Sequence, residues 1–113
     1  MNETENRLQR AKSFEAKEDY QRAINEYKEI TKSHGQDQDI AHQHLAIIFA
    51  KLENYQEAIR HSQKALSLNS DLAFPHHVMA YSLYKTGELE EAVSELQKEI
   101  KKSPPTSKAV SIY

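Results

Sequence analysis

The chain has 113 residues, no cysteine, 28% charged residues and a formal net charge of −2 at pH 7. This length suits one domain, and the slight acidity gives no basic footprint for nucleic acid. Without cysteine, disulfides, thiol nucleophiles and cysteine-ligated zinc are excluded. The polar start MNETENRLQR is unlike a secretory signal. No apolar run approaches the ~20 residues of a membrane span, so we expect a cytoplasmic protein without membrane insertion.

Apolar residues recur at helical spacing through most of the chain, and no stretch alternates convincingly, which predicts an all-α fold. Thr4 and Asp71 suit the N-caps of the first and fifth helices, and Pro75 is tolerated only in a first turn. Gly87 separates the last two helices, and Pro104–Pro105 ends the sixth. The predicted helices cover about residues 4–17, 20–33, 39–52, 55–68, 72–86 and 88–102.

One pattern occurs three times along the chain. Ala23, Ala58 and Ala92 are separated by 35 and then 34 residues. The same two shifts align four more columns: Ala11, Ala46 and Ala80; Phe14, Phe49 and Leu83; Tyr20, Tyr55 and Leu89; and Ile24, Ile59 and Val93. A period near 34 residues of paired helices is typical of a stacked solenoid.

This pattern resembles the tetratricopeptide repeat, which carries Trp, Leu, Gly and Tyr on its first helix, then Ala and Phe, then Pro. The second-helix Ala is kept three times here, but the Trp site holds Arg7, His42 and His76. The resemblance implies a right-handed α-solenoid of three helix-turn-helix repeats forming one domain over residues 1–113. The predicted repeats cover about residues 4–38, 39–72 and 73–105, followed by a tail at 106–113.

In this family the first helices line a concave groove that holds peptides or helices, so the resemblance implies a binding surface. Helical spacing selects the residues of these helices that point away from the partner helix. They are Leu8, Lys12, Gln43, His44, Ile47, Lys51, Phe74, His77, Val78, Tyr81, Tyr84 and Lys85. The aromatic and aliphatic members predict a wall for an apolar peptide or an amphipathic helix with acidic flanks. Burial between repeats is the competing interpretation for Phe74 and Val78.

A subclass of the family grips the terminal carboxylate of chaperone tails with a clamp of Lys, Asn, Asn, Lys and Arg. The corresponding sites here hold Leu8, Lys12, His44, Phe74 and Val78. Only one of them is a permanent cation, and none is Asn. We therefore predict that the chain does not bind such tails, because the charge-assisted donors are missing.

The six histidines suggest no metal site, because His42/His44 and His76/His77 are spaced so that they do not share a helix face. A glycine-rich phosphate loop, a nucleophile elbow and a paired-carboxylate pocket are all absent from the sequence. We predict no cofactor and no enzymatic activity.

Two functions fit this sequence. One is a protein-binding or peptide-binding module, serving as adaptor, scaffold or small chaperone. The alternative is self-assembly into dimers or filaments through the last helix, whose apolar face has no predicted seventh helix to cover it. That face comprises Val93, Leu96 and Ile100. The tail contains the apolar residues Val110, Ile112 and Tyr113. It is either a frayed end, or it covers this face or a neighbouring molecule.

Overall fold

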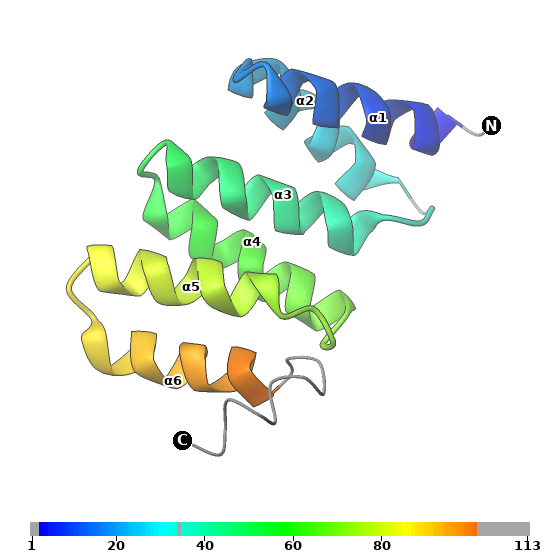
Figure 1. The fold of residues 1–113 in the computed structure, drawn as a ribbon. Coiled ribbons are helices and arrows are strands. Elements are labelled where there is room, and N and C mark those ends of the chain that lie inside the picture. Colours follow the sequence, from blue (N-terminus) through cyan, green and yellow to red (C-terminus); the bar gives the residue numbers. More distant parts are fainter. Residues whose placement is uncertain (1–2, 34, 102–113) are drawn as a thin grey trace.

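The computed structural model describes residues 3–33 and 35–101, which form six helices stacked in series (Figure 1). They are α1 (Glu3–Ala16), α2 (Tyr20–Lys32), α3 (Gln38–Lys51), α4 (Tyr55–Leu68), α5 (Phe74–Lys85) and α6 (Leu89–Lys101). No strand occurs among the described residues, and the predicted all-α solenoid of helix-turn-helix repeats is confirmed. No helix in this part of the chain is long and apolar enough to cross a bilayer.

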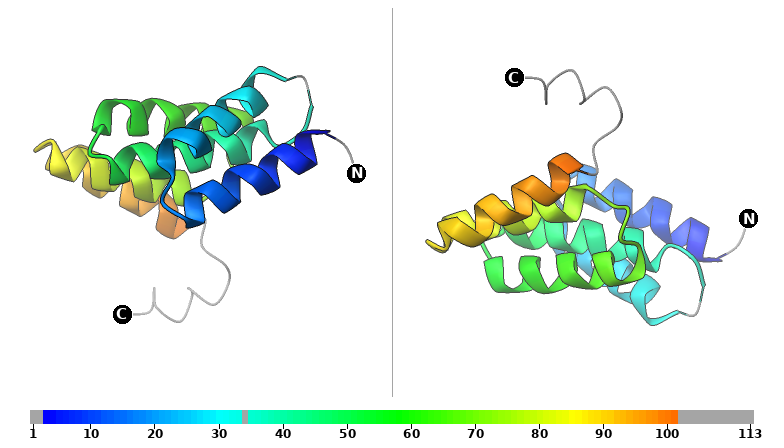
Figure 2. Two further views of the ribbon diagram at one scale, coloured as in Figure 1. Left: turned by 90° about the horizontal axis from the view of Figure 1, so that it is seen from above. Right: turned by 90° about the horizontal axis from the view of Figure 1, so that it is seen from below.

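Successive helices form three antiparallel pairs, α1–α2, α3–α4 and α5–α6, which we number as repeats one to three. Neighbouring repeats stack so that α3 contacts α2, and α5 contacts both α4 and α3. α1 and α6 lie at opposite ends of the stack, which Figure 2 shows from its two ends. This stacking brings the first helices of repeats two and three side by side.

The turn inside each repeat contains one left-handed residue at the same place. The φ angle is 61° at Glu18, 62° at Glu53 and 92° at Gly87. In the first two repeats the next residue, Asp19 or Asn54, caps the second helix by accepting a backbone N–H bond three residues ahead. The predicted break at Gly87 is confirmed, and glycine suits its positive φ because it lacks a Cβ atom.

Small side chains lie where helices approach closely. Ala23 and Ala58 are completely buried, as are Ala11 and Ala46 on the facing first helices. The side chain of Ala92 lies outside the described part of the structure. Because an alanine adds only a methyl group at the contact, the two helix axes of a repeat can approach closely there.

Two predicted N-caps are wrong. α1 begins one residue before Thr4, which therefore lies inside the helix. α5 begins directly after Ala73, whose side chain makes no capping bond, so Asp71 is not the cap. Instead, the backbone N–H of Asp71 donates to Asn69 Oδ1 at 3.1 Å, which holds this residue in a turn. Pro75 does lie in the first turn of α5, as predicted.

The outer face of α6 remains apolar. Val93 is 55% exposed and Leu96 is 40% exposed. The predicted stop at Pro104–Pro105 and the tail at 106–113 lie outside the described residues.

We predict that Ala58→Leu lowers the free energy of unfolding by about 1–3 kcal/mol, because the added carbons overpack the α3–α4 contact. Urea unfolding followed by circular dichroism measures this change. Gln56→Leu is the control, because Gln56 is exposed on the same helix and the change should stay within about 0.5 kcal/mol. Equal unfolding midpoints for the two variants would contradict the assigned alanine contact.

Candidate functional site

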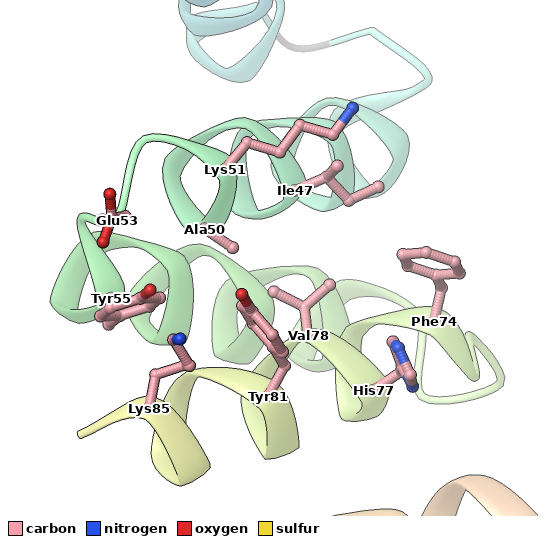
Figure 3. A pocket seen from close by; sticks show the side chains of 10 residues that line it. All are labelled: Ile47, Ala50, Lys51, Glu53, Tyr55, Phe74, His77, Val78, Tyr81 and Lys85. Atoms are coloured by element: carbon pink, nitrogen blue, oxygen red, sulfur yellow. The ribbon is translucent and has the colours of Figure 1, made fainter. Parts of the chain in front are cut away.

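A cleft of about 430 Å³ lies between α3 and α5, with the first residue of α4 at one end (Figure 3). Its volume falls within the range of ligand pockets in proteins. The lining residues are Ile47, Ala50, Lys51, Glu53, Tyr55, Phe74, His77, Val78, Tyr81 and Lys85.

One face of α5 supplies the apolar wall of this cleft. Phe74, Val78, Tyr81 and Lys85 recur at three- to four-residue spacing, so they lie along one side of the helix. Val78 is only 5% exposed and forms the floor, whereas Phe74 and Tyr81 are 48% and 46% exposed. The cleft therefore offers two aromatic side chains above a closed aliphatic base.

Two lysines lie beside aromatic rings at the edge of the cleft. Lys85 Nζ is 6.0 Å from the ring centroid of Tyr81, and Lys51 Nζ is 5.9 Å from that of Tyr20. A cation at this distance is attracted by the negative ring face. This attraction holds Lys85 beside Tyr81 in the cleft, whereas Lys51 lies against a ring of α2 that does not line the cleft. Glu53 adds one acidic group, so the lining carries two permanent cations and one carboxylate.

The rings of Tyr55 and Tyr81 meet edge to face, with centroids 6.1 Å apart and planes at 65°. Loss of surrounding water raises the pKa of Tyr55, and the neighbouring Tyr81 and Glu53 add to this rise. The Tyr55 phenol therefore stays neutral at physiological pH and can donate a hydrogen bond to a ligand.

Seven of the twelve residues predicted for the groove line this cleft: Ile47, Lys51, Phe74, His77, Val78, Tyr81 and Lys85. The other five lie elsewhere. Leu8 is in the hydrophobic core at 8% exposure, and Gln43 is partly buried. Lys12 is exposed on α1, and Tyr84 is 61% exposed on α5 without lining the cleft.

The remaining predicted residue, His44, takes part in a polar network between repeats one and two. Its Nδ1 lies 3.0 Å from Glu15 Oε1, and its ring stacks on Tyr27 with centroids 5.1 Å apart. The Tyr27 hydroxyl donates to the same carboxylate oxygen at 2.7 Å. Burial alone raises the pKa of Glu15, but the hydrogen bonds from His44 and Tyr27 outweigh it, so the net pKa is lowered. This network joins α3 to α1 through His44 and Glu15, and Tyr27 adds a contact from α2.

The helical spacing along the first helices does not predict three of the cleft residues, which are Ala50, Glu53 and Tyr55. Tyr55 begins a second helix, and Glu53 lies in a turn, so the spacing along the first helices selects neither. The sequence does contain a signal for Tyr55, because Tyr20 occupies the same repeat column. In the structure Tyr20 contacts Lys51, the equivalent of Lys85 in the next repeat.

The model of the tetratricopeptide repeat family matches residues 8–73, which is more than half of the chain. The chain belongs to the tetratricopeptide repeat family. A search of curated proteins finds no match to its sequence.

Among solved structures, the chain is similar to the second tetratricopeptide repeat domain of Spaghetti (RPAP3) bound to the HSP90 peptide SRMEEVD. The TM-score is 0.83 at 20% sequence identity, and the match covers 89% of this chain and 87% of that one. This similarity shows that the two chains share the tetratricopeptide repeat fold.

At the tetratricopeptide Trp site, each repeat has a polar residue paired with a residue 19 positions later. Arg7 Nη1 donates to Glu26 Oε1 at 3.0 Å in repeat one. The equivalent atoms are His42 Nδ1 and His61 Nδ1, 2.9 Å apart, in repeat two. In repeat three they are His76 Nδ1 and Glu95 Oε2, 2.7 Å apart. These pairs tie the two helices of each repeat together where an indole packs in the family pattern.

The two histidines of repeat two are buried, at 7% exposure for His42 and 4% for His61. Desolvation lowers the pKa of His61 to about 4, and Arg60, whose guanidinium lies 3.2 Å from His61 Nε2, contributes further. Desolvation also lowers the pKa of His42, followed by repulsion from Lys64 and Arg60. Both imidazoles are therefore neutral at pH 7. The described residues contain no group of three or more side chains suited to hold a metal ion.

We predict that acid destabilises this tetratricopeptide repeat fold through these histidines. Below an unfolded pKa of 6.5 the unfolded chain binds protons that folded His61 does not, so stability falls with pH until about 4. His61 alone should cost about 2 kcal/mol between pH 7.5 and 5. Urea unfolding across this range measures the loss.

The double variant His42→Asn/His61→Asn removes both titrating groups and keeps hydrogen-bonding side chains, so its stability should depend less on pH in this window. His77→Gln is the control, because His77 is exposed and its loss should leave the acid sensitivity of the parent protein. An unchanged pH slope in the double variant would show that other groups cause the acid sensitivity.

Proposed function

We propose that this chain is a non-enzymatic protein-interaction module that binds an amphipathic segment of a partner protein in the cleft between α3 and α5. The observation that carries the proposal is the pair of half-exposed aromatic residues, Phe74 and Tyr81, above the buried Val78. The module would act as an adaptor, scaffold or small chaperone.

The apolar part of the ligand follows from the cleft lining. Burying Phe74 and Tyr81 against an aliphatic or aromatic side chain removes apolar surface from water on both partners. Tyrosine is enriched at protein interfaces because it combines a large apolar ring with a hydrogen-bonding hydroxyl. A bound helix would present such anchors at three- to four-residue spacing.

The charges at the edge of the cleft indicate which charge the ligand carries. Lys51 and Lys85 are both exposed, and Glu53 offsets only one of them. A carboxylate beside the apolar anchor of the ligand would be attracted by the two lysines. Because these charges are exposed, the attraction would mainly raise the association rate. We therefore propose a segment with an apolar centre and at least one acidic flank.

The ligand bound by the RPAP3 domain ends in an acidic tail, but the carboxylate-clamp positions of this chain do not favour that mode. Leu8 and Val78 are buried, and His44 is held by Glu15. Lys12 is the only permanent cation among the five positions. A terminal carboxylate would find too few charge-assisted donors to replace its hydration.

The cleft proposal predicts different effects for two neighbouring tyrosines. Peptides selected on the wild-type chain by phage display serve as ligands, and isothermal titration calorimetry gives their affinities. Tyr81→Ala should weaken binding by at least about tenfold, because truncating a central aromatic side chain typically costs more than 1 kcal/mol. Tyr84→Ala should leave the affinity near that of wild type, because Tyr84 does not line the cleft. Circular dichroism checks that both variants fold. Equal affinities in all three proteins would rule out the cleft.

Clamp binding is tested with the peptide SRMEEVD itself, in free-acid and C-terminally amidated forms. We expect no difference in affinity between the two forms, because the clamp donors are missing. A loss of tenfold or more on amidation would show that this chain recognises a terminal carboxylate by other residues.

A further inference from the structure

The surface between α1 and α3 contains groups that the equivalent surface between α3 and α5 lacks. Between α1 and α3, the ring of His44 stacks on Tyr27, and both side chains hydrogen-bond to the Glu15 carboxylate. The equivalent positions of the next repeat hold three smaller side chains, which are Val78 for His44, Ser62 for Tyr27 and Ala50 for Glu15. Two rings and one carboxylate are therefore missing where the cleft lies.

A ligand can supply only those missing groups whose places are accessible from outside. The side chains of His44 and Glu15 are 22% and 14% exposed. Their equivalents, Val78 and Ala50, both line the cleft. Ser62 has no exposed surface, so the third place is closed to a ligand. The cleft can therefore accept one aromatic ring and one carboxylate in the places that His44 and Glu15 occupy in the preceding surface.

Equivalent lysines lie beside the two surfaces, and they differ in their acidic neighbour. Burial raises the pKa of Glu15, and the charge of Lys51 is among the interactions that lower it, so these two groups attract each other. Lys85 is the equivalent of Lys51, but Ala50 gives it no carboxylate in the place of Glu15. Glu53 does not make up the difference, because the turn of the first repeat has a glutamate at the same place. A ligand can provide the carboxylate that Lys85 lacks.

We propose that the ligand of the cleft carries an aromatic ring and a carboxylate, which take the places of the His44 ring and the Glu15 carboxylate. This inference rests on the proposed function, because it names the groups of the segment that the cleft binds. The carboxylate pairs with Lys85 and not with Lys51. In Figure 3, Lys85 lies beside Tyr81 in the cleft, whereas Lys51 extends away from that ring.

The preceding surface also indicates how far apart the two groups of the ligand are. His44 Nδ1 lies 3.0 Å from Glu15 Oε1, so the ring and the carboxylate are direct neighbours. On a bound helix, neighbouring side chains are three or four residues apart in the sequence. The ligand is therefore a segment with Phe, Tyr or Trp and, three or four residues away, Asp or Glu.

Peptides selected on the wild-type chain by phage display test the two groups together. We expect the peptides that bind the cleft to be enriched several-fold in an aromatic residue with Asp or Glu three or four positions away. Binding in the cleft is recognised by a loss of affinity in Tyr81→Ala. Cleft binders without this pair of residues would overturn the inference and leave the proposed function intact. A selection that yields no cleft binder would overturn both.

A double-mutant cycle tests the choice between the two lysines. The chain contains no tryptophan, so a selected peptide with Trp as its aromatic residue reports its binding by fluorescence. Changing the acidic residue of this peptide to its amide should weaken binding to wild type by at least about threefold. The change should have almost no effect on binding to Lys85→Met, because the partner of the carboxylate is gone. Lys51→Met is the matched control and should keep the wild-type loss. Equal losses in the two variants would overturn the pairing with Lys85.

A second pair of variants tests the place of the carboxylate. Ala50→Glu supplies a carboxylate from the chain itself, in the place that Glu15 has beside Lys51. The amide form of the peptide should then bind this variant at least as tightly as the acidic form, because two carboxylates would compete for Lys85. Ala50→Gln adds a similar volume without charge and should keep the preference for the acidic form. The same preference in both variants would contradict the proposed place. Circular dichroism checks that all four variants fold.

Discussion

The close contact between the two helices of each repeat is the constraint on which the structure depends. Alanines without exposed surface lie at this contact on both α1–α2 and α3–α4. The helices of a repeat lie close together, and neighbouring repeats stack as helix pairs, which places α3 beside α5. The cleft between α3 and α5 is a consequence of this stacking, and its lining depends on which side chains those two helices carry.

The same stacking gives a different surface between repeats one and two. His44 corresponds to Val78, and Glu15 to Ala50, so the aliphatic floor of the cleft becomes a polar network with Tyr27. The partly buried carboxylate of Glu15 accepts two hydrogen bonds, so it offers little to a ligand. One backbone geometry therefore yields a polar network between repeats one and two and an open cleft between repeats two and three.

The repeated alanines and the helical spacing were enough to predict the six helices, their pairing and the solenoid. The caps were harder to predict, because a suitable residue such as Asp71 can form a turn with Asn69 before the helix begins. Helical spacing alone does not determine which residues line the groove. Helical spacing predicts Leu8 and Tyr81 on the same surface, yet stacking buries Leu8 and leaves Tyr81 half exposed. Glu53 and Tyr55 join the cleft only through the turn between α3 and α4.

The polar pairs at the Trp site show how the fold tolerates the loss of its largest family residue. An indole fills the space between two helices by packing, whereas Arg7–Glu26, His42–His61 and His76–Glu95 bridge it with hydrogen bonds. The His42–His61 pair depends on protonation, because desolvation lowers the pKa of both imidazoles, and a buried imidazole that gains a proton must be solvated or leave the core. The central repeat contains the pair with two imidazoles, and α3 also supplies Ile47 and Lys51 to the cleft. The helix that forms one wall of the cleft therefore also contains His42, one of the two imidazoles through which we predict that acid destabilises the fold.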